Sequence, residues 1–424
     1  MPRFHFPALF VVTFLAAAWA NAASLGLEEV GSDAVRSNPA LAAARWRIEE
    51  ARARLQNSGR LPNPAIDTEF RQNFRSAERS MEASFTQRFP LTARLRLEKE
   101  VSRAELTAAE EEVRDGERKL MAQARALVVR LLAIEAQRGL RDTQLANSRQ
   151  IAEFTRKRVE VGEASITDAT LVELEARQLE TEVLLLGVER STLTGELRLL
   201  LGLSPGDEIA LRGGLPAMGA LPAPGVRVSE RPDYQAAQAG AAAARSGVEL
   251  ERARKWDDLG VGLARTSEYR EDAPEGFDRE EFWGLRLSLP LPLWNDNAGK
   301  VREAAAIAAR RVQEAEALAL TIHAEAATAR SEMAALAKVI GAMDRTMIPT
   351  ATQVEEQLRT AQSTGQTTLI EVLRARDRRF QLQRQRLDAL RDFHLARIRH
   401  DSATARDLGR SSAARVPRTT GRTK

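Results

Sequence analysis

The sequence predicts a mainly α-helical protein with a small membrane β part, built from a duplicated unit of helix, strand, strand, long helix, tip and helix. Three observations predict this fold class: landmarks recur in the two halves of the chain, short segments alternate apolar and polar residues, and long proline-free segments carry a heptad pattern. The composition agrees, because 5% aromatic and 29% charged residues are typical of long solvated helices.

The duplication is visible as three pairs of landmarks that occur in the same order in both halves. These pairs are Asn38-Pro39 with Arg231-Pro232, Pro90 with Pro290, and Gly162 with Gly365. The separation between partners grows slowly along the chain, from 193 to 200 to 203 residues. A fixed order with a slowly growing separation indicates an internal repeat.

The repeat and the composition together predict the domain boundaries. A signal peptide at 1–22 precedes the first repeat at 23–201, which has strands at about 65–90 and a coiled-coil hairpin at about 91–201 with its tip at 161–168. A proline-rich linker at 202–228 leads to the second repeat at 229–405, which has strands at about 258–290 and a hairpin at about 294–405 with its tip at 362–371. Residues 406–424 form a basic tail without helical periodicity, which is predicted to be disordered.

The signal peptide sets the expected compartment. Arg3 precedes an apolar run over residues 6–19, and Ala20-Asn21-Ala22 has the small-x-small pattern that signal peptidase cleaves. An N-terminal membrane anchor is the alternative, although the run is short for a membrane span. The chain has no cysteine, so neither disulfides nor a lipid-bearing cysteine are expected.

The predicted strands have one apolar face. Met81, Ala83 and Phe85 alternate with polar residues in the first half, and Trp283, Leu285 and Leu287 alternate with less apolar ones in the second. Each half should therefore contribute a hairpin of roughly ten-residue strands, the length that crosses a bilayer when tilted. No stretch after the signal peptide reaches the roughly 20 apolar residues of a membrane-spanning helix, so any crossing should use strands.

The long helices carry the strongest pattern in the chain. From Val301 to Met347, all fourteen successive a and d positions of a heptad register are apolar, and many are alanine, which implies close helix approach. The first half shows the same register more loosely from Leu106 to Ile134. Residues 91–161 contain no proline, and as one helix they would span roughly 105 Å. A globular domain does not need that length.

No catalytic or metal-binding constellation is found. No acid, base and nucleophile converge, so we expect no enzyme activity and no cofactor. His394 and His400 are six residues apart, not the three or four that would place two ligands on one helix face. The 63 basic and 59 acidic residues are interspersed, so nothing calls for a nucleic-acid partner. We also expect no metal site.

The two predicted tips are the candidate functional sites. Gly162 and Gly365 interrupt strong helical patterns, and each would let the chain reverse between two antiparallel helices. Asp168 and Glu371 would open the following helices, where a carboxylate complements the helix dipole and caps free N–H groups. A purely structural role, with a C-cap glycine and a capping acid, explains these residues about as well as a functional one.

With these residues in view, the sequence resembles the outer-membrane efflux (TolC) family over nearly the whole mature chain. The likeness is carried by Asn38-Pro39 with its Ala-rich helix, by the tip segment 161–168 (Val-Gly-Glu-Ala-Ser-Ile-Thr-Asp), and by its partner segment 365–371. The segment 290–295 (Pro-Leu-Pro-Leu-Trp-Asn) looks like the heavy-metal-efflux (CzcC-like) branch.

The resemblance implies an architecture, a location and partners. It implies a homotrimer, since four strands per chain cannot close a barrel whereas three chains supply twelve. The expected assembly is a trimeric 12-stranded β-barrel in outer-membrane lipid, continued by an antiparallel coiled-coil α-barrel into the periplasm of a Gram-negative bacterium. Its expected partners are a periplasmic adaptor (membrane fusion protein) and an inner-membrane pump. Small toxic solutes, with heavy-metal cations among the candidates, would pass through this passive conduit.

The resemblance also implies roles for the tips. Acids at these positions can line the periplasmic channel entrance, so Asp168 and Glu371 are predicted there, with Arg374 or Arg376 pairing with a neighbouring acid. The predicted adaptor-docking residues are Gly162, Ser165, Gly365 and Thr368. The alternative is a periplasmic coiled-coil adaptor, although adaptors usually show one hairpin flanked by β-rich domains.

Overall fold

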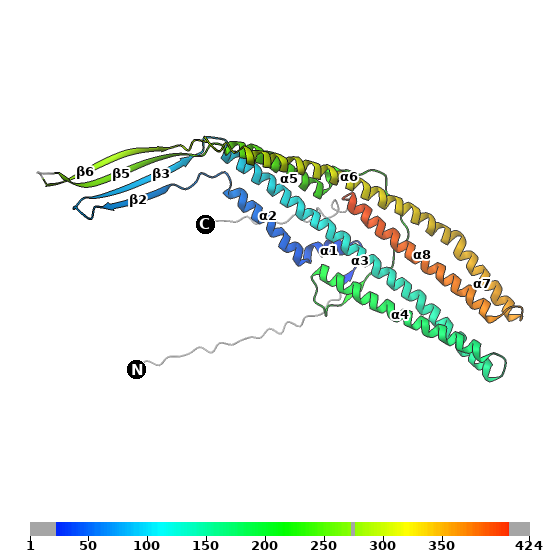
Figure 1. Cartoon of the computed structure of the whole chain (residues 1–424). Helices are drawn as coiled ribbons and strands as arrows, with labels where there is room; N and C mark the ends of the chain where they lie inside the picture. The colour runs from blue at the N-terminus through cyan, green and yellow to red at the C-terminus, as the bar shows by residue number, and fades with distance from the viewer. Residues whose placement is uncertain (1–22, 273–275, 407–424) are drawn as a thin grey trace, which may run out of the picture. The chain divides into compact units, whose positions relative to one another are not determined.

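The computed structural model describes residues 23–272 and 276–406, and most of them are helical (Figure 1). The predicted signal peptide lies outside the described residues, as does the predicted basic tail after Arg406. The chain divides into two compact units. The first unit contains Met1–Ala34 with Ala124–Pro216, and the second contains Val35–Gln123 with Ala217–Lys424. The helix from Arg94 to Glu160 contributes residues to both.

The first half contains four helices, one more than the predicted unit, because a short helix, α1, precedes the helix that Asn38-Pro39 opens. They are α1 (Val30–Ser37), α2 (Pro39–Asn57), α3 (Arg94–Glu160) and α4 (Ile166–Leu201). Asn38 caps α2 as its side-chain oxygen accepts a 2.8 Å hydrogen bond from the Leu41 N–H, and Pro39 occupies the first helical position, where no N–H is needed. Helix α3 has 67 residues, so it is about 100 Å long at 1.5 Å per residue.

The second half has the predicted order of helix, strand, strand, long helix, tip and helix, with one irregularity in its long helix. It contains α5 (Pro232–Ala253), α6 (Ala298–Ala342), α7 (Ile348–Ser363) and α8 (Leu369–Ala403). A π-helical turn, η2 (Met343–Met347), separates α6 from α7, so the predicted first arm of the hairpin is continuous but not uniformly α-helical. Pro349 has no N–H to donate to the carbonyl four residues earlier, which accounts for a shift in the hydrogen-bond ladder here.

The heptad seam forms the core of the second unit. Helix α6 packs against α5 and α8, and α7 packs against α8. The seven buried residues of α6 all lie on the predicted seam: Ala308, Ala315, Ile322, Ala326, Ala329, Met333 and Ile340. Ala305 and Met347, near the ends of the seam, are exposed. The register predicted from sequence is therefore confirmed along the middle of the helix.

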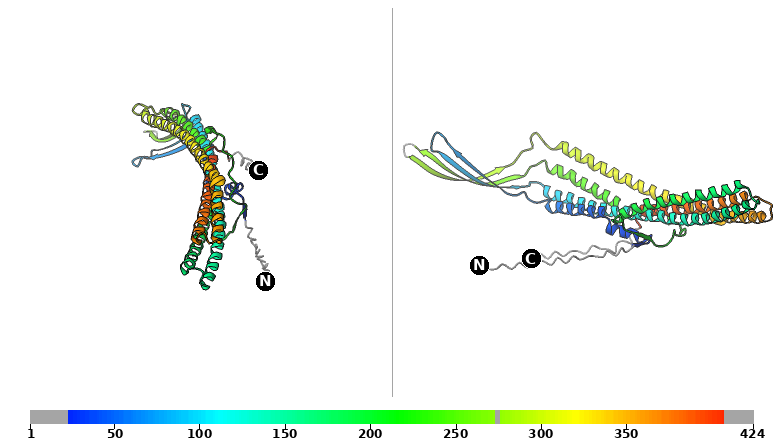
Figure 2. Two further views of the ribbon diagram at one scale, coloured as in Figure 1. Left: turned by 90° about the vertical axis from the view of Figure 1, so that its right-hand side faces the viewer. Right: turned by 90° about the horizontal axis from the view of Figure 1, so that it is seen from below.

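The strands β2, β3, β5 and β6 form one antiparallel sheet in the second unit, in the order β2-β3-β5-β6 (labelled in Figure 1 and seen from two other sides in Figure 2). Their bounds are β2 Ala65–Gln72, β3 Arg79–Phe89, β5 Leu259–Asp272 and β6 Gly276–Ser288. The hairpin of the first half pairs with that of the second through β3 and β5, with Phe85 opposite Leu263. The predicted strands thus exist, and the two hairpins combine into one sheet.

The sheet has one apolar and one polar face. Ile66, Phe85, Leu263 and Leu285 are consecutive partners across the four strands, so they share a face. On this face Ile66 is 74% exposed and Leu285 is 72% exposed. The neighbouring positions on the opposite face include Glu82, Thr86 and Arg286. The single chain therefore leaves a broad apolar surface uncovered.

The first unit contains a feature that the sequence did not predict. β1 (Ala23–Leu25) pairs in parallel with β4 (Ile209–Leu211), which lies in the predicted linker. Three-residue strands are too short to show an alternating pattern, so periodicity could not reveal them. Among the described helices, none combines the length and apolar character needed to cross a membrane.

Candidate functional site

The first tip joins α3 to α4 within the first unit. Gly162 has a φ of +76°, in the left-handed region where glycine is favoured. The Gly162 N–H donates to the Val159 carbonyl at 3.0 Å, and the Glu163 N–H donates to the Arg158 carbonyl at 2.8 Å. This is the Schellman pattern of a helix that ends in a sharp turn, as the interrupting glycine predicted.

The second tip, between α7 and α8 in the second unit, has the same backbone geometry. Gly365 has a φ of +73°. Its N–H donates to the Gln362 carbonyl at 3.1 Å, and the Gln366 N–H donates to the Ala361 carbonyl at 2.9 Å. The two glycine bends are thus local copies of one another, which agrees with duplication of the hairpin.

Hydroxyl side chains cap the helices that follow the tips. The Ser165 hydroxyl accepts a 3.1 Å hydrogen bond from the Thr167 N–H at the start of α4. The Thr368 hydroxyl accepts from the Glu371 N–H at 3.4 Å, and the Glu371 carboxylate accepts from the Thr368 N–H at 3.3 Å, which completes a capping box for α8. Ser165 and Thr368 therefore have structural roles at the positions predicted for adaptor docking.

The two predicted entrance acids differ in their surroundings. Each lies in the first turn of its helix, three residues after the cap, so the caps are hydroxyls where the sequence suggested acids. Glu371 is exposed and its carboxylate also accepts from the Thr367 hydroxyl. Asp168 is half-buried and makes no hydrogen bond within the described part of the chain. Glu371 thus has a structural role in the capping box of α8. For Asp168, the structural role is limited to a favourable interaction with the dipole of α4.

The two predicted arginine partners lie close together on α8 but have different environments. Arg374 is exposed. Arg376 is buried inside the second unit, with 5% of its surface exposed. Of these two side chains, only that of Arg374 faces solvent in the isolated unit.

Ion pairs between the helices brace each hairpin. In the first unit, Arg141 of α3 pairs with Glu182 of α4 at 2.7 Å. In the second unit, Arg386 of α8 pairs with Asp344 of η2, and Arg379 of α8 pairs with Glu355 of α7. The two helices of each hairpin are therefore joined by ion pairs as well as by apolar coiled-coil packing.

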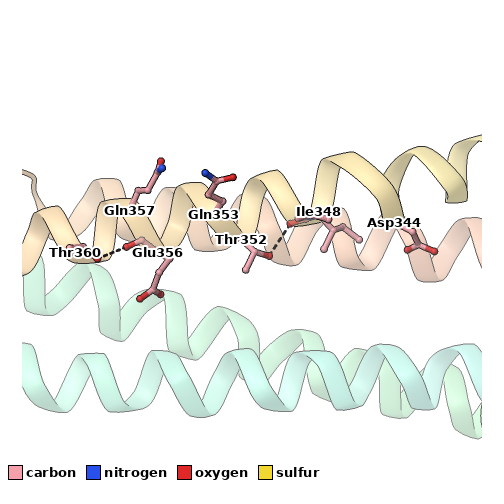
Figure 3. Close-up of a pocket in the computed structure, with 8 residues that line it drawn as sticks. Asp344, Ile348, Thr352, Gln353, Glu356, Gln357 and Thr360 are labelled. Atoms are coloured by element: carbon pink, nitrogen blue, oxygen red, sulfur yellow. Dashed lines mark hydrogen bonds between the residues drawn. The ribbon is translucent and has the colours of Figure 1, made fainter.

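An open groove runs along one face of η2 and α7 beside the Asp344 pair (Figure 3). The Thr352 and Thr360 hydroxyls each donate to a carbonyl one turn earlier in the same helix, at 2.8 and 2.9 Å. Its lining otherwise consists of Ile348, Pro349, Gln353, Glu356 and Gln357. Every lining side chain comes from one helical strip, so the groove is a helix surface without converging catalytic groups.

Possible metal-binding clusters were sought among the described residues outside this groove. Those residues contain no group of three or more His, Asp or Glu side chains that could hold a metal ion. His394 and His400 are both buried in α8. The candidate sites are therefore surfaces and charged linings. The sequence did not reveal the charged lining of the sheet, because which charged residues become neighbours on its polar face depends on the strand register.

The fold is that of solved outer-membrane channels. The chain superposes on CusC, whose structures describe folding and transmembrane channel formation, with a TM-score of 0.77, 19% identity, and coverage of 95% of this chain and 98% of that one. The chain also superposes on VceC, an outer membrane protein of Vibrio cholerae, with a TM-score of 0.70, 20% identity, and coverage of 90% of this chain and 96% of that one. For the open state of the MtrE outer membrane channel of Neisseria gonorrhoeae, the TM-score is 0.71 and the identity 17%, with coverage of 95% of this chain and 97% of that one.

A family match agrees with this fold class. Residues 30–203 match the family described as Outer membrane efflux protein, so this segment carries the sequence signature of that family. The segment includes β2, β3, both long helices of the first half and the first tip. No curated protein matches the sequence significantly.

Proposed function

We propose that the chain is a subunit of an outer-membrane efflux channel and belongs as a whole to the outer membrane efflux protein family. It would act as a passive conduit for small toxic solutes, driven by an inner-membrane pump through a periplasmic adaptor. The observation that carries this proposal is the two-faced sheet joined to long coiled helices, in a chain whose fold matches solved outer-membrane channels.

The sheet itself supports a trimer. Its order leaves β2 and β6 as edges, and an unpaired edge is not tolerated in lipid. Three copies would join these edges into a closed barrel of twelve strands, with the apolar face toward lipid and the polar face toward the pore.

The helices support the same assembly. Helix α4 exposes a series of large apolar side chains: Leu171, Leu174, Leu184, Leu185, Val188 and Leu199. An apolar strip of this extent is rarely left in water, and a neighbouring copy would cover it. The alternative function, a periplasmic coiled-coil adaptor, leaves the exposed apolar face of the sheet unexplained.

The assembly is tested by purifying the full chain from membranes. We expect a heat-modifiable trimer in the outer-membrane fraction that needs detergent to remain in solution. A water-soluble monomer would contradict the proposal. Deleting the gene should sensitise the cell to exported compounds, and a panel that includes heavy-metal salts tests the metal specificity suggested by residues 290–295.

We further propose that the tips form the channel entrance, with Asp168 and Glu371 of three copies supplying a ring of carboxylates, and Arg374 or Arg376 pairing with a neighbouring acid in the closed state. Two substitutions separate this role from helix capping. Glu371→Gln keeps an oxygen that can complete the capping box but removes the charge, whereas Glu371→Ala removes both. An entrance role predicts that both variants change single-channel conductance and cation preference. A capping role predicts that Glu371→Gln behaves like the unmodified protein.

The docking role of Gly162, Ser165, Gly365 and Thr368 is tested by crosslinking. Photo-crosslinkers placed beside each glycine bend should capture the adaptor. Crosslinks that map only to the strand hairpins would contradict the docking assignment.

A further inference from the structure

A hollow lies where the sheet meets the helices in the second unit, and its lining is rich in positive charge. Seven arginine and lysine side chains line it, against two aspartates. We call it the junction vestibule. It is built from several segments that are distant in sequence: the segment before β2, the first residue of α3, the α5–β5 loop, the facing ends of β3, β5 and β6, and residues 290–300.

The vestibule opens on the polar face of the sheet. Thr86, Gly260, Arg286 and Ser288 all line it. Thr86 and Arg286 are both partners of Gly262, and Gly260 is the partner of Ser288, so these residues share the face opposite the apolar row. In the proposed barrel this face lines the pore, and the vestibule would surround the passage between barrel and helices.

Part of the positive charge is neutralised by ion pairs. Arg94 pairs with Asp258 at 2.8 Å, and Arg286 pairs with Glu82 at 2.6 Å. Arg254 similarly pairs with Glu251 at 2.6 Å. These arginines are held in place by acids and shape the wall of the vestibule.

The other cations of the lining make no ion pair within the described residues. Arg88, Lys255 and Lys300 are exposed and have no ion pair within the described part of the chain. Arg60 also lines the vestibule, and its guanidinium donates to the Gln56 carbonyl, which carries no charge. Against these four cations stand Asp257 in the lining and Glu251, whose carboxylate interacts electrostatically with Lys300. The vestibule therefore has a surplus of positive charge, which threefold symmetry would turn into a ring.

Aromatic surface lies beside the charge. Trp256 and Trp294 both line the vestibule, and Trp294 is 93% exposed. An indole ring provides a flat apolar contact for another ring, while lysine and arginine attract carboxylate, sulfonate and phosphate groups. A cleft lined by one sign of charge also concentrates counter-ions.

We propose that the junction vestibule binds aromatic organic anions in transit, so that the exported solutes include this chemical class. This inference rests on the proposed channel function and adds a substrate class to it. It gives residues 290–295 a part in a solute-binding wall. It also separates two charged zones along the pore: carboxylates at the tips and cations at the junction.

The test uses current block from the sheet side of the full-length trimer in a planar bilayer of neutral phosphatidylcholine. The probe is naphthalenetrisulfonate, an aromatic anion that does not cross lipid. The combined variant Arg88→Gln, Lys255→Gln, Lys300→Gln should need a roughly tenfold higher probe concentration for half block. The matched control, Arg79→Gln, Arg265→Gln, Arg279→Gln, removes three cations from the opposite face of the sheet and should leave the block unchanged.

Two further arms address the aromatic contact and the source of the anion. Trp256→Ala should weaken block by naphthalenetrisulfonate but not by inorganic tripolyphosphate. Adding anionic phosphatidylglycerol to the bilayer should not remove the difference between the unmodified protein and the combined variant. If it did, the cations would bind lipid headgroups and the proposal would be overturned.

The outcomes separate this inference from the function on which it rests. Trimers that conduct but are blocked equally in the unmodified protein and the combined variant would overturn the vestibule assignment alone. Trimers that never conduct would overturn the channel function as well. If the combined variant does not assemble, Lys255→Gln alone, in an exposed loop, should still shift the block in the same direction, and no shift would count against the proposal.

Discussion

Replacing Arg118 should detach the end of α8 from α3 in the second unit. Arg118 is 4% exposed, and its guanidinium donates to the Asp115 carboxylate at 2.9 and 2.6 Å. It also donates to the Ser402 carbonyl at 2.9 Å and to the Ser402 hydroxyl at 2.6 Å. One buried side chain therefore joins two helices whose residues are 284 positions apart in sequence.

The expected size of the effect follows from what the substitution leaves behind. Breaking a buried ion pair by removing one partner costs about 3–5 kcal/mol when the other charge stays unpaired. Here Asp115 keeps an ion pair with Lys119 at 2.7 Å, and Asp233, 3.7 Å from Arg118, keeps its pair with Arg231 at 2.8 Å. We therefore expect Arg118→Met to lower the free energy of unfolding by about 2–3 kcal/mol per chain, below the range for an orphaned charge.

The assay compares urea denaturation midpoints, followed by circular dichroism in detergent at fixed protein concentration, with hydrogen exchange near Ser402 as a local readout. The matched control is Arg96→Met on the same helix, where an exposed pair with Glu100 at 3.7 Å should contribute below about 0.5 kcal/mol. The reasoning is refuted if Arg118→Met and Arg96→Met destabilise equally. It is also refuted if exchange near Ser402 does not change.

Three further substitutions test the tip, the seam and a buried acid. Gly365→Ala should lower the free energy of unfolding by about 1 kcal/mol because alanine would have to adopt a positive φ. In the same denaturation assay, the control Gly187→Ala inside α4 should raise the free energy of unfolding by about 0.5–1 kcal/mol. Equal effects would contradict the tip geometry. Met333→Ala on the seam should lower the free energy of unfolding by about 2–5 kcal/mol, and Met347→Ala at the exposed end of the seam should lower it by less than about 1 kcal/mol. The reverse order would contradict the assignment of the seam as the core. Burial raises the pKa of the Glu111 carboxyl, although Arg114 opposes this shift, so the ionised carboxylate destabilises the folded state. At pH values above the pKa of the folded state, Glu111→Gln should therefore raise the melting temperature. This gain should vanish as the pH falls below the pKa of the unfolded state. A gain that grows toward acid pH would show the sign to be wrong.

Periodicity predicted the features that depend on local repetition. The seam of α6 was readable because a coiled coil buries the same two heptad positions over many turns, so each turn repeats the same signal. The glycine bends were readable for a similar reason, since Gly162 and Gly365 stand alone in strong helical patterns and both adopt a positive φ. The strands were readable from period-two alternation, and their bounds agree with the predicted ranges.

The sequence did not reveal which charges come together. Arg118 and Ser402 are neighbours only because the C-terminal end of α8 contacts α3 within the second unit, and no local pattern encodes that contact. The caps at Ser165 and Thr368 were attributed to the acids three residues later, because a first-turn acid and a capping hydroxyl both favour the same helix end. Arg374 and Arg376, two positions apart on α8, have opposite environments that depend on which face the neighbouring helices cover.

The sequence by itself therefore determined the order of the long helices and of β2, β3, β5 and β6, together with the coiled seam and the two bends, because each of these is specified by residues close together in the chain. Only the tertiary structure decided that both hairpins join in one sheet and that Arg88, Lys255 and Lys300 line a common hollow. Such convergence depends on strand register and helix packing between distant segments. Those are set by the whole fold, and no single segment carries them.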